Sequence, residues 1–397
     1  MKTYDWIVIG GGLAGSAVGY ELAQAGFRVL LLEQSPTANS GTNCSYGGIA
    51  YWSGTTPLMR QLCQEGIELH RTLSAELEGD TEFREINLLL TIDADRDPQS
   101  VAAPYSSMKI APTLVDRATA CELEPLLNPD AVSGALVVKH GHVSPEAVVQ
   151  TYQQAMRRLG GEIIHDRVTG FWQSEADPTQ YQGVLTATDC YAAAHTVVCA
   201  GGVSRSLLRQ AEISVKVYAT IAEIVELPPS EIHLQTLVMP AELKRFELEA
   251  VAGAVDSQWD EPNREIAPVI LDAGAVQFRD GRIRVGQISR VFSDPLKPTE
   301  NLGGEQEMRS AIGRLIPALQ EQPGRWRSCS VAFSGDRLPL VGAIPGCSGI
   351  HVFSGFGNPF AILPPLARRF ACSAAGQPDS LIAEVSPARF QVPLASA

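Results

Sequence analysis

The chain has 397 residues and a formal net charge of −13, with 45% hydrophobic and 19% charged residues. This ordinary globular composition excludes wholesale disorder, and the length favours two domains or three. The acidic balance argues against nucleic acid as a general partner, because phosphate binding requires a basic surface, but it leaves room for an anionic substrate held by one local arginine.

The cysteines and the apolar runs set further limits. Eight cysteines are scattered without a Cys-x-x-Cys pair, so neither a zinc site nor a disulfide framework is expected. The N-terminal residues do not resemble a signal peptide, and no apolar run reaches the roughly 18 residues of a membrane span. We therefore expect a cytoplasmic protein without a transmembrane segment. We also expect no metal site, because His140-x-His142 has no third ligand nearby.

The chain opens with a pattern typical of a βαβ unit. Residues Trp6–Ile9 form a short apolar run, and a glycine-rich turn, Gly10–Gly15, follows at once. Residues Ser16–Ala25 then read as a helix, and a second apolar run, Val29–Leu32, ends at Glu33. This order of strand, turn, helix and strand is that of a dinucleotide-binding unit.

The glycine spacing within this unit is Gly10-x-Gly12-x-x-Gly15. In such a fingerprint the first glycine permits a tight turn, the second admits a pyrophosphate to the helix N-terminus, and the third packs the helix on the strand. Glu33 can accept hydrogen bonds from a ribose, and an acid there disfavours the 2′-phosphate of NADP. The fingerprint alone does not separate FAD from NAD.

The rest of the chain alternates in the same way, apart from a central stretch. Residues of about 217–292 contain alternating segments joined by the turn Asp280-Gly281, which is typical of antiparallel hairpins. The other expected elements are a helix over Pro145–Leu159, strands over Glu162–His165, Val184–Thr188, Thr196–Cys199, Leu338–Gly342 and Gly349–Ser354, and a helix over Ile362–Ala375. The expected fold is α/β: a Rossmann-type domain with an inserted, mostly antiparallel β-sheet domain.

Six further blocks occur in a recognisable order. They are Gly41-Thr42-Asn43-Cys44-Ser45-Tyr46-Gly47-Gly48, His142-Val143-Ser144-Pro145, Thr196-Val197-Val198-Cys199-Ala200-Gly201-Gly202, Asp280-Gly281-Arg282-Ile283-Arg284-Val285-Gly286, Asp336-Arg337-Leu338-Pro339-Leu340-Val341-Gly342 and Ser354-Gly355-Phe356-Gly357-Asn358-Pro359-Phe360. Together with the fingerprint, they resemble the D-amino-acid oxidase-like family of FAD-dependent oxidoreductases, which includes glycine oxidase, sarcosine oxidase and D-amino-acid dehydrogenases.

The resemblance implies an extended FAD and assigns residues to it. The backbone of Val168 would contact adenine, the segment Gly355–Phe360 would close over the isoalloxazine ring, and Ser45–Gly48 would lie along its other side. The full set of expected FAD-binding residues is Gly10, Gly12, Leu13, Ala14, Gly15, Glu33, Gln34, Asn43, Cys44, Ser45, Tyr46, Gly47, Gly48, Val168, Ala200, Gly201, Gly355, Phe356, Gly357, Asn358, Pro359 and Phe360.

The resemblance also divides the chain and predicts how FAD is held. Residues 1–90, 143–215 and 330–397 would form a discontinuous FAD-binding domain, and residues 91–142 and 216–329 a substrate domain. Some relatives attach FAD covalently through His or Cys. Here the loop 41–48 has no histidine, and Cys347 precedes the flavin turn, so we predict noncovalent FAD.

The implied reaction is oxidation of an amine or amino acid by hydride transfer to flavin N5, followed by hydrolysis of the imine. The electron acceptor would be oxygen, a quinone or another acceptor, so oxidase and dehydrogenase stay open. Two alternatives also stay open: a 2-hydroxy-acid dehydrogenase on the same scaffold, and a flavin-binding accessory factor without turnover.

The sequence departs from the family pattern in the expected substrate site. Amino-acid oxidases of this family often clamp the substrate carboxylate with an arginine, which would fall near Val331 here. The stretch Cys329–Phe333 has none, and the nearest candidate is Arg327. Either another arginine replaces the clamp or the substrate is not a simple α-amino acid.

Three residues are the candidate catalytic or substrate-binding groups. Arg284 lies in the expected roof of the pocket, where we place it over the flavin; the alternative is a solvated charge on an exposed sheet face. Tyr51 and Trp52 could line an aromatic pocket for an amine, or could simply pack in the core. Tyr46 could stack near the flavin.

Overall fold

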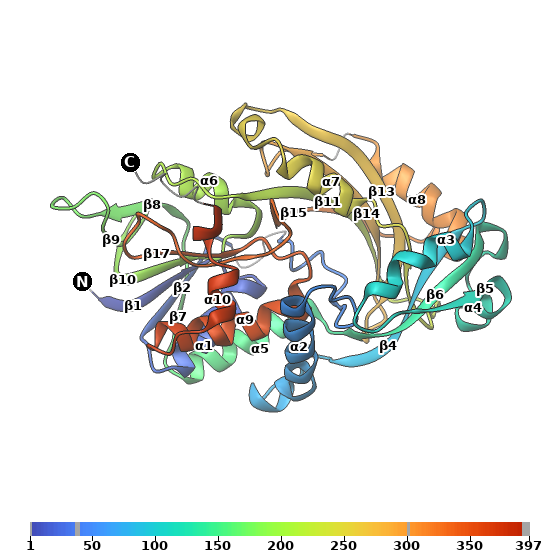
Figure 1. The fold of residues 1–397 in the computed structure, drawn as a ribbon, viewed down its shortest axis with the longest axis horizontal. Helices are drawn as coiled ribbons and strands as arrows, with labels where there is room; N and C mark the ends of the chain where they lie inside the picture. The colour runs from blue at the N-terminus through green and yellow to red at the C-terminus, as the bar shows by residue number, and fades with distance from the viewer. Residues whose placement is uncertain (1, 36–39, 300–301, 391–397) are drawn as a thin grey trace.

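The computed structural model describes residues 2–35, 40–299 and 302–390. Two sheets lie at opposite ends of an elongated molecule (Figure 1). The first sheet has the strand order β16-β17-β10-β1-β2-β7, with β9 paired to β10 and β8 to β9. These strands are β1 (Thr3–Ile9), β2 (Val29–Glu33), β7 (Glu162–His165), β8 (Val168–Gln173), β9 (Tyr181–Thr186), β10 (Cys190–Val198), β16 (Leu340–Ala343) and β17 (Ile350–Ser354).

Strands β7, β2, β1, β10 and β17 run parallel to one another. Alternate residues of β1 therefore enter different cores: Trp6 and Val8 pack towards the helices, and Ile7 and Ile9 pack on the opposite face. Figure 1 shows this helical layer on one side of the sheet, with α6 (Ser204–Arg209) on the other. The layer holds α1 (Leu13–Gln24), α2 (Pro57–Glu76), α5 (Pro145–Arg158), α9 (Pro359–Ala374) and α10 (Ser380–Glu384).

The second sheet has the order β15-β11-β14-β13-β12-β4-β6-β3, with β5 paired to β6. Its neighbours are antiparallel apart from β12 and β4. The strands are β3 (Gly48–Ile49), β4 (Arg84–Asp93), β5 (Thr113–Asp116), β6 (Val132–His142), β11 (Val217–Leu227), β12 (Leu237–Pro240), β13 (Glu265–Gln277), β14 (Ile283–Phe292) and β15 (Arg325–Ser334). The helices α3 (Pro98–Ala102), α4 (Arg117–Leu123), α7 (Arg245–Gly253) and α8 (Gly304–Leu315) accompany it.

The expected α/β class, a parallel sheet combined with a mostly antiparallel one, is confirmed. Strands β2 and β7 have the predicted bounds, whereas α1 begins three residues earlier than the expected Ser16. It does so because Gly12, which has an extended backbone, caps the helix from within the glycine turn. The helix N-terminus thus lies within the fingerprint, which is what an anion-binding turn requires.

Candidate active site

A cavity of about 1800 Å³ extends from the carboxyl ends of β1 and β2 to the face of the second sheet. Residues of the first sheet line one part of it, including the glycine turn, Glu33 and the segment after β10. Residues of β4, β6, β12, β13 and β14 line the other part. In open α/β sheets, ligands bind outside the carboxyl ends of the parallel strands, and the cavity lies at that edge.

The glycine turn has the geometry that its spacing predicts. Gly10 has a φ of +106°, and a Cβ there would lie 2.6 Å from the carbonyl oxygen of Cys199. A Cβ on Gly15 would lie 1.8 Å from the carbonyl oxygen of Gly10, so only glycine fits. Gly12, Leu13 and Ala14 line the cavity with the first turn of α1, and backbone N–H groups at such a turn can bind phosphate oxygens.

Glu33 ends β2 at the edge of the cavity. Its Oε2 accepts a hydrogen bond of 2.6 Å from the N–H of Gly11, and its Oε1 accepts one of 3.0 Å from the N–H of Ser35. These bonds orient the carboxylate and leave it lone pairs for ribose hydroxyls. Gln34 lines the cavity beside it.

Glu33→Gln should weaken FAD binding about tenfold. The amide NH₂ of the glutamine would face one of the two backbone N–H donors, and the site would lose its charged acceptor for the ribose. Fluorescence titration of FAD into the apoprotein checks this. Glu162→Gln is the matched control, because Glu162 lies on the neighbouring β7 and forms an exposed ion pair of 2.7 Å with Lys2. Equal affinities for the two variants would contradict the assignment of Glu33.

The loop 40–48 lies along the cavity and leads into β3. Cys44, Ser45, Tyr46 and Gly48 line the cavity, whereas Asn43 and Gly47, which were also expected to contact the cofactor, do not. Gly47 instead provides the turn: its φ is +69°, and a Cβ there would lie 2.1 Å from the carbonyl oxygen of Val143.

Cys44 faces Cys329 of β15 at the base of this loop, in a small apolar cluster that also contains Ala222 and Ile224. Its thiol is hydrogen-bonded to that of Cys329, which lowers the pKa of Cys44 and raises the pKa of Cys329. Both cysteines line the cavity.

The remaining residues expected at the cofactor also line the cavity, apart from Gly15, which packs α1 against the turn and is not among the lining residues. The lining residues are Val168 of β8, Ala200 and Gly201 after β10, Gly355, Phe356, Gly357 and Asn358 from the turn before α9, and Pro359 and Phe360 from the start of α9. The side-chain NH₂ of Asn358 donates to the carbonyl oxygen of Ala50 at 3.2 Å. This bond joins the turn 355–358 to the segment that follows the loop 40–48. The two segments that line opposite sides of the cavity are thus connected directly.

The position of Arg284 differs from the expected one. The residue is fully buried and does not line the cavity. Its guanidinium pairs with Glu226 at 3.0 Å and with Glu146, and it donates to the carbonyl oxygen of Ser45. The expectation of a residue over the ring is therefore corrected, and so is the alternative of a solvated surface charge. Arg284 therefore supports the loop 40–48 through its bond to Ser45, from the side that faces away from the cavity.

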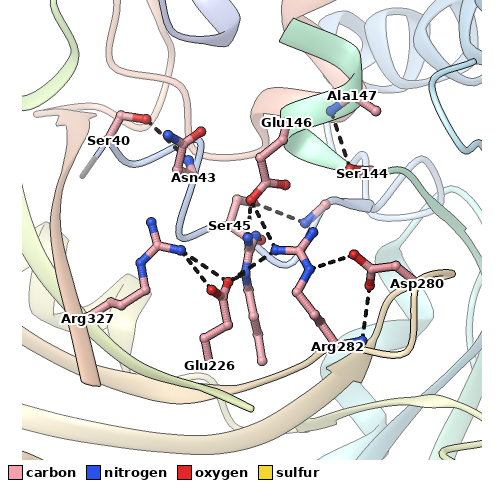
Figure 2. Close-up of polar contacts among 12 residues, drawn as sticks. Ser40, Asn43, Ser45, Ser144, Glu146, Ala147, Glu226, Asp280, Arg282 and Arg327 are labelled. Carbon is pink, nitrogen blue, oxygen red and sulfur yellow. Dashed lines mark hydrogen bonds and ion pairs between the residues drawn. The ribbon is translucent and has the colours of Figure 1, made fainter. Parts of the chain in front are cut away.

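Arg284 belongs to a compact cluster of alternating charges. Figure 2 shows Glu226 between Arg282 and Arg327, and Glu146 above Arg282. Arg327 pairs with Glu226 at 3.1 Å, and Arg282 pairs with Asp280 at 2.6 Å. Because Arg327 is engaged in this cluster and does not line the cavity, it does not take the place of the missing clamp. Val331 lines the cavity at the expected clamp position.

The aromatic residues divide between the cavity and the core. Trp52 lines the cavity and stacks with Tyr105, the ring centroids lying 6.3 Å apart. Tyr51 does not line this cavity, so its expected place in an aromatic pocket is corrected; it packs in the core of the first sheet. Tyr46 lines the cavity, but its hydroxyl oxygen lies 2.9 Å from the carbonyl oxygens of both Gly274 and Gly286, so its one proton is engaged by the backbone.

Several lining residues were not foreseen from the sequence. Thr42 Oγ1 accepts a 3.1 Å hydrogen bond from the N–H of Leu13, at the start of α1. His140, Asp272 and Met239 line the part of the cavity beside the second sheet. The spacing of His140 and His142 is visible in the sequence, but it does not show that His140 lines the cavity. No group of residues in the described part of the chain is arranged to hold a metal ion.

The chain matches the family model described as "FAD dependent oxidoreductase" over residues 5–372. It therefore belongs to the FAD-dependent oxidoreductase family, and FAD is its cofactor. An uncharacterised oxidoreductase of Bacillus subtilis, YurR, is 23% identical over 374 residues, which cover 90% of each chain.

Two further comparisons concern relatives with named activities. 4-Methylaminobutanoate oxidase (formaldehyde-forming) of Paenarthrobacter nicotinovorans is 25% identical over 90% of this chain, but the match covers only 42% of that longer relative. The crystal structure of glycine oxidase from Geobacillus kaustophilus superposes with a TM-score of 0.80 and 19% identity, covering 99% of this chain and 100% of that one. The fold is thus that of the glycine oxidase structure.

Within residues 2–35, 40–299 and 302–390, no helix is long and apolar enough to cross a membrane.

The mode of FAD attachment stays a prediction. Three cysteines line the cavity, Cys44, Cys199 and Cys329, whereas Cys347 is not among its lining residues. Burial raises the pKa of Cys199, which makes that thiol a poor nucleophile. We expect acid precipitation to release all yellow colour into the supernatant. Colour that stays with the protein pellet would contradict noncovalent binding.

Proposed function

We propose that this protein oxidises an amine or amino acid at the carbon that bears the nitrogen. The observation that carries the proposal is the continuous cavity, which joins a fitted dinucleotide cradle to an apolar and aromatic compartment on the second sheet. The names of the relatives, which include 4-methylaminobutanoate oxidase and glycine oxidase, support an amine or amino-acid donor.

The residues fit FAD on three structural observations. The turn Gly10–Gly15 leaves no room for a side chain at its first and last positions, the first turn of α1 faces the cavity, and the Glu33 carboxylate is oriented at its edge. Bound FAD supplies the two-electron acceptor for hydride removal. We assign residues 1–90, 143–215 and 330–397 mainly to holding it, and residues 91–142 and 216–329 mainly to the substrate.

The chain's own residues orient the reactants and exclude water. The turn 355–360 and the loop 40–48 would hold the flavin from its two sides, and the Arg284 cluster would keep the loop in place. Trp52, Leu88 and Leu237 would cover the substrate with apolar surface. Such a site needs no side-chain nucleophile; it needs a neutral amine held with its C–H bond close to the acceptor.

An anaerobic titration of the purified holoprotein tests the proposal. The panel contains glycine, sarcosine, D- and L-amino acids, aromatic amines and 2-hydroxy acids, and flavin absorbance is the measurement. Bleaching by an amine or amino acid is the expected result, and readmission of air then separates an oxidase from a dehydrogenase. Bleaching by a 2-hydroxy acid alone, or by no compound, would favour one of the two alternatives and contradict the proposal.

A further inference from the structure

Four deeply buried polar side chains line the cavity within the described part of the chain. They are Thr91, His140, Asp272 and Ser354. The hydroxyl of Thr91 donates to the carbonyl oxygen of Met239 at 3.3 Å, and Ser354 shares a hydrogen bond of 3.4 Å with Ser204. Both hydroxyls are thus engaged within the protein.

Asp272 and His140 have different hydrogen-bonding states. The Asp272 carboxylate accepts from the N–H groups of Lys244 and Arg245, at 3.2 Å each, so it caps the start of α7 and brings no donor. His140 is 4% exposed. Its only hydrogen bond among the described residues comes from Trp52, whose indole N–H donates to Nδ1 at 3.0 Å.

This bond fixes the tautomer of His140. An indole N–H can only donate, so Nδ1 carries a lone pair and the single ring proton lies on Nε2. Burial lowers the pKa of His140 to about 3, so the ring is neutral at physiological pH. The Nε2 atom faces the loop that lines the cavity, because a Cβ added to Gly48 would lie 2.6 Å from it. The site therefore holds one fixed, neutral N–H donor with no acceptor among the described residues.

The surroundings of this donor are unsuited to a carboxylate. The apolar residues that line the same part of the cavity include Trp52, which is hydrogen-bonded to His140, and Leu88, Leu90, Leu237 and Met239 of β4 and β12. None of the cationic residues of the lining lies on β6 or on its neighbour β4, and all are exposed or half-buried; they are Arg96, Arg167, Lys244, Arg245 and Arg314. A carboxylate held by one neutral donor would lose its hydration without a compensating charge.

We propose that the Nε2–H of His140 binds a neutral acceptor oxygen of the substrate, and that the site selects amines whose reacting carbon carries an amide, ester or similar group in place of a carboxylate. This inference rests on the proposed function for its reaction, but the recognition of a neutral acceptor can be measured without turnover. His140 is thus a substrate-positioning residue.

Binding of two unreactive probes tests this recognition in the holoprotein. Benzamide and benzoate have the same shape and differ in charge, and either perturbs the flavin spectrum when it binds close to the ring. We expect benzamide to bind at least about tenfold more tightly, and His140→Phe to weaken benzamide about fivefold with FAD content unchanged. His351→Phe, a histidine outside the lining, should leave benzamide binding unchanged.

Two results would overturn the inference. One is benzoate binding as tightly as benzamide. The other is a His140→Phe variant that loses FAD and not benzamide affinity, because the donor would then serve the cofactor.

The tautomer provides a readout that does not depend on a ligand. In the holoprotein labelled with ¹⁵N-histidine, we expect Nε2 of His140 to be protonated and Nδ1 unprotonated, and Trp52→Phe to remove that bias. A protonated Nδ1 in the unmodified protein would contradict the inference.

Anaerobic reduction of the flavin by sarcosine and by its amide then tests whether the same preference for a neutral group holds for a reacting substrate. The amide should reduce the flavin at least about tenfold faster at equal concentration. Reduction by neither compound, with benzamide still bound through His140, would contradict the proposed function and leave the recognition intact. Faster reduction by sarcosine would contradict the inference and leave the proposed function intact.

Discussion

Replacing Gly15 by alanine should abolish FAD retention and lower the free energy of unfolding by about 3 kcal/mol. The added Cβ would lie 1.8 Å from the carbonyl oxygen of Gly10. Gly10 cannot move away easily, because its N–H donates to the carbonyl oxygen of Leu32 at 2.8 Å. Relief therefore requires α1 to lift from β1, which carries the first-turn N–H groups away from the pyrophosphate.

The ratio of flavin to protein absorbance and chemical unfolding measure the two effects of this substitution. Gly170→Ala is the matched control: Gly170 has no heavy atom within 4 Å of an added Cβ and lies in β8 of the same sheet. A Gly15→Ala variant that purifies with one FAD per chain and normal stability would contradict the fitted turn.

Replacing Arg284 by methionine should lower the free energy of unfolding by about 3 kcal/mol, because it leaves two half-buried carboxylates with fewer partners. Among the described residues, Glu146 would keep its contact with Arg282, and Glu226 its contacts with Arg282 and Arg327, whereas the carbonyl oxygen of Ser45 would lose its donor. FAD should also dissociate faster, because the loop 40–48 lines the cavity that holds it.

Arg282→Met is the control for this second substitution. Arg282 lies on the same strand and pairs with the same two carboxylates, but its side chain is 28% exposed. Its loss should cost less than about 1 kcal/mol. Equal stability of the two variants, or an Arg284→Met variant with unaltered FAD release and turnover, would show that the buried cluster does not support the loop.

The cofactor side of the site could be predicted from sequence because its constraints are local. The tight turn at Gly10, the close helix packing at Gly15 and the acid at Glu33 all fall within one βαβ unit, where chain order fixes spatial order. The strand bounds of β2 and β7 were right for the same reason: short apolar runs between turn residues leave little choice.

The substrate side could not be predicted, because it depends on contacts between distant segments. Arg284 and Glu146 are 138 residues apart in the chain, and Trp52 and His140 are 88 apart. Alternation along a strand places Arg284 on the same face as Arg282, but the sequence does not show that carboxylates from β11 and α5 cover that face. His140 looked like half of a metal pair, and only the position of the Trp52 indole shows which ring nitrogen carries the proton.

The strand order of the first sheet has a consequence for how the protein is made. β1 pairs with β10, and β10 pairs with β17, which spans Ile350–Ser354. The central strand β10 therefore pairs on one side with a strand that lies about 150 residues further along the chain. That strand, β17, is made late in synthesis. Pairing between such distant strands is slow and leaves apolar edges open to aggregation. The first sheet is therefore complete only after β17 has been made, and until then the open edge of β10 is a site for aggregation.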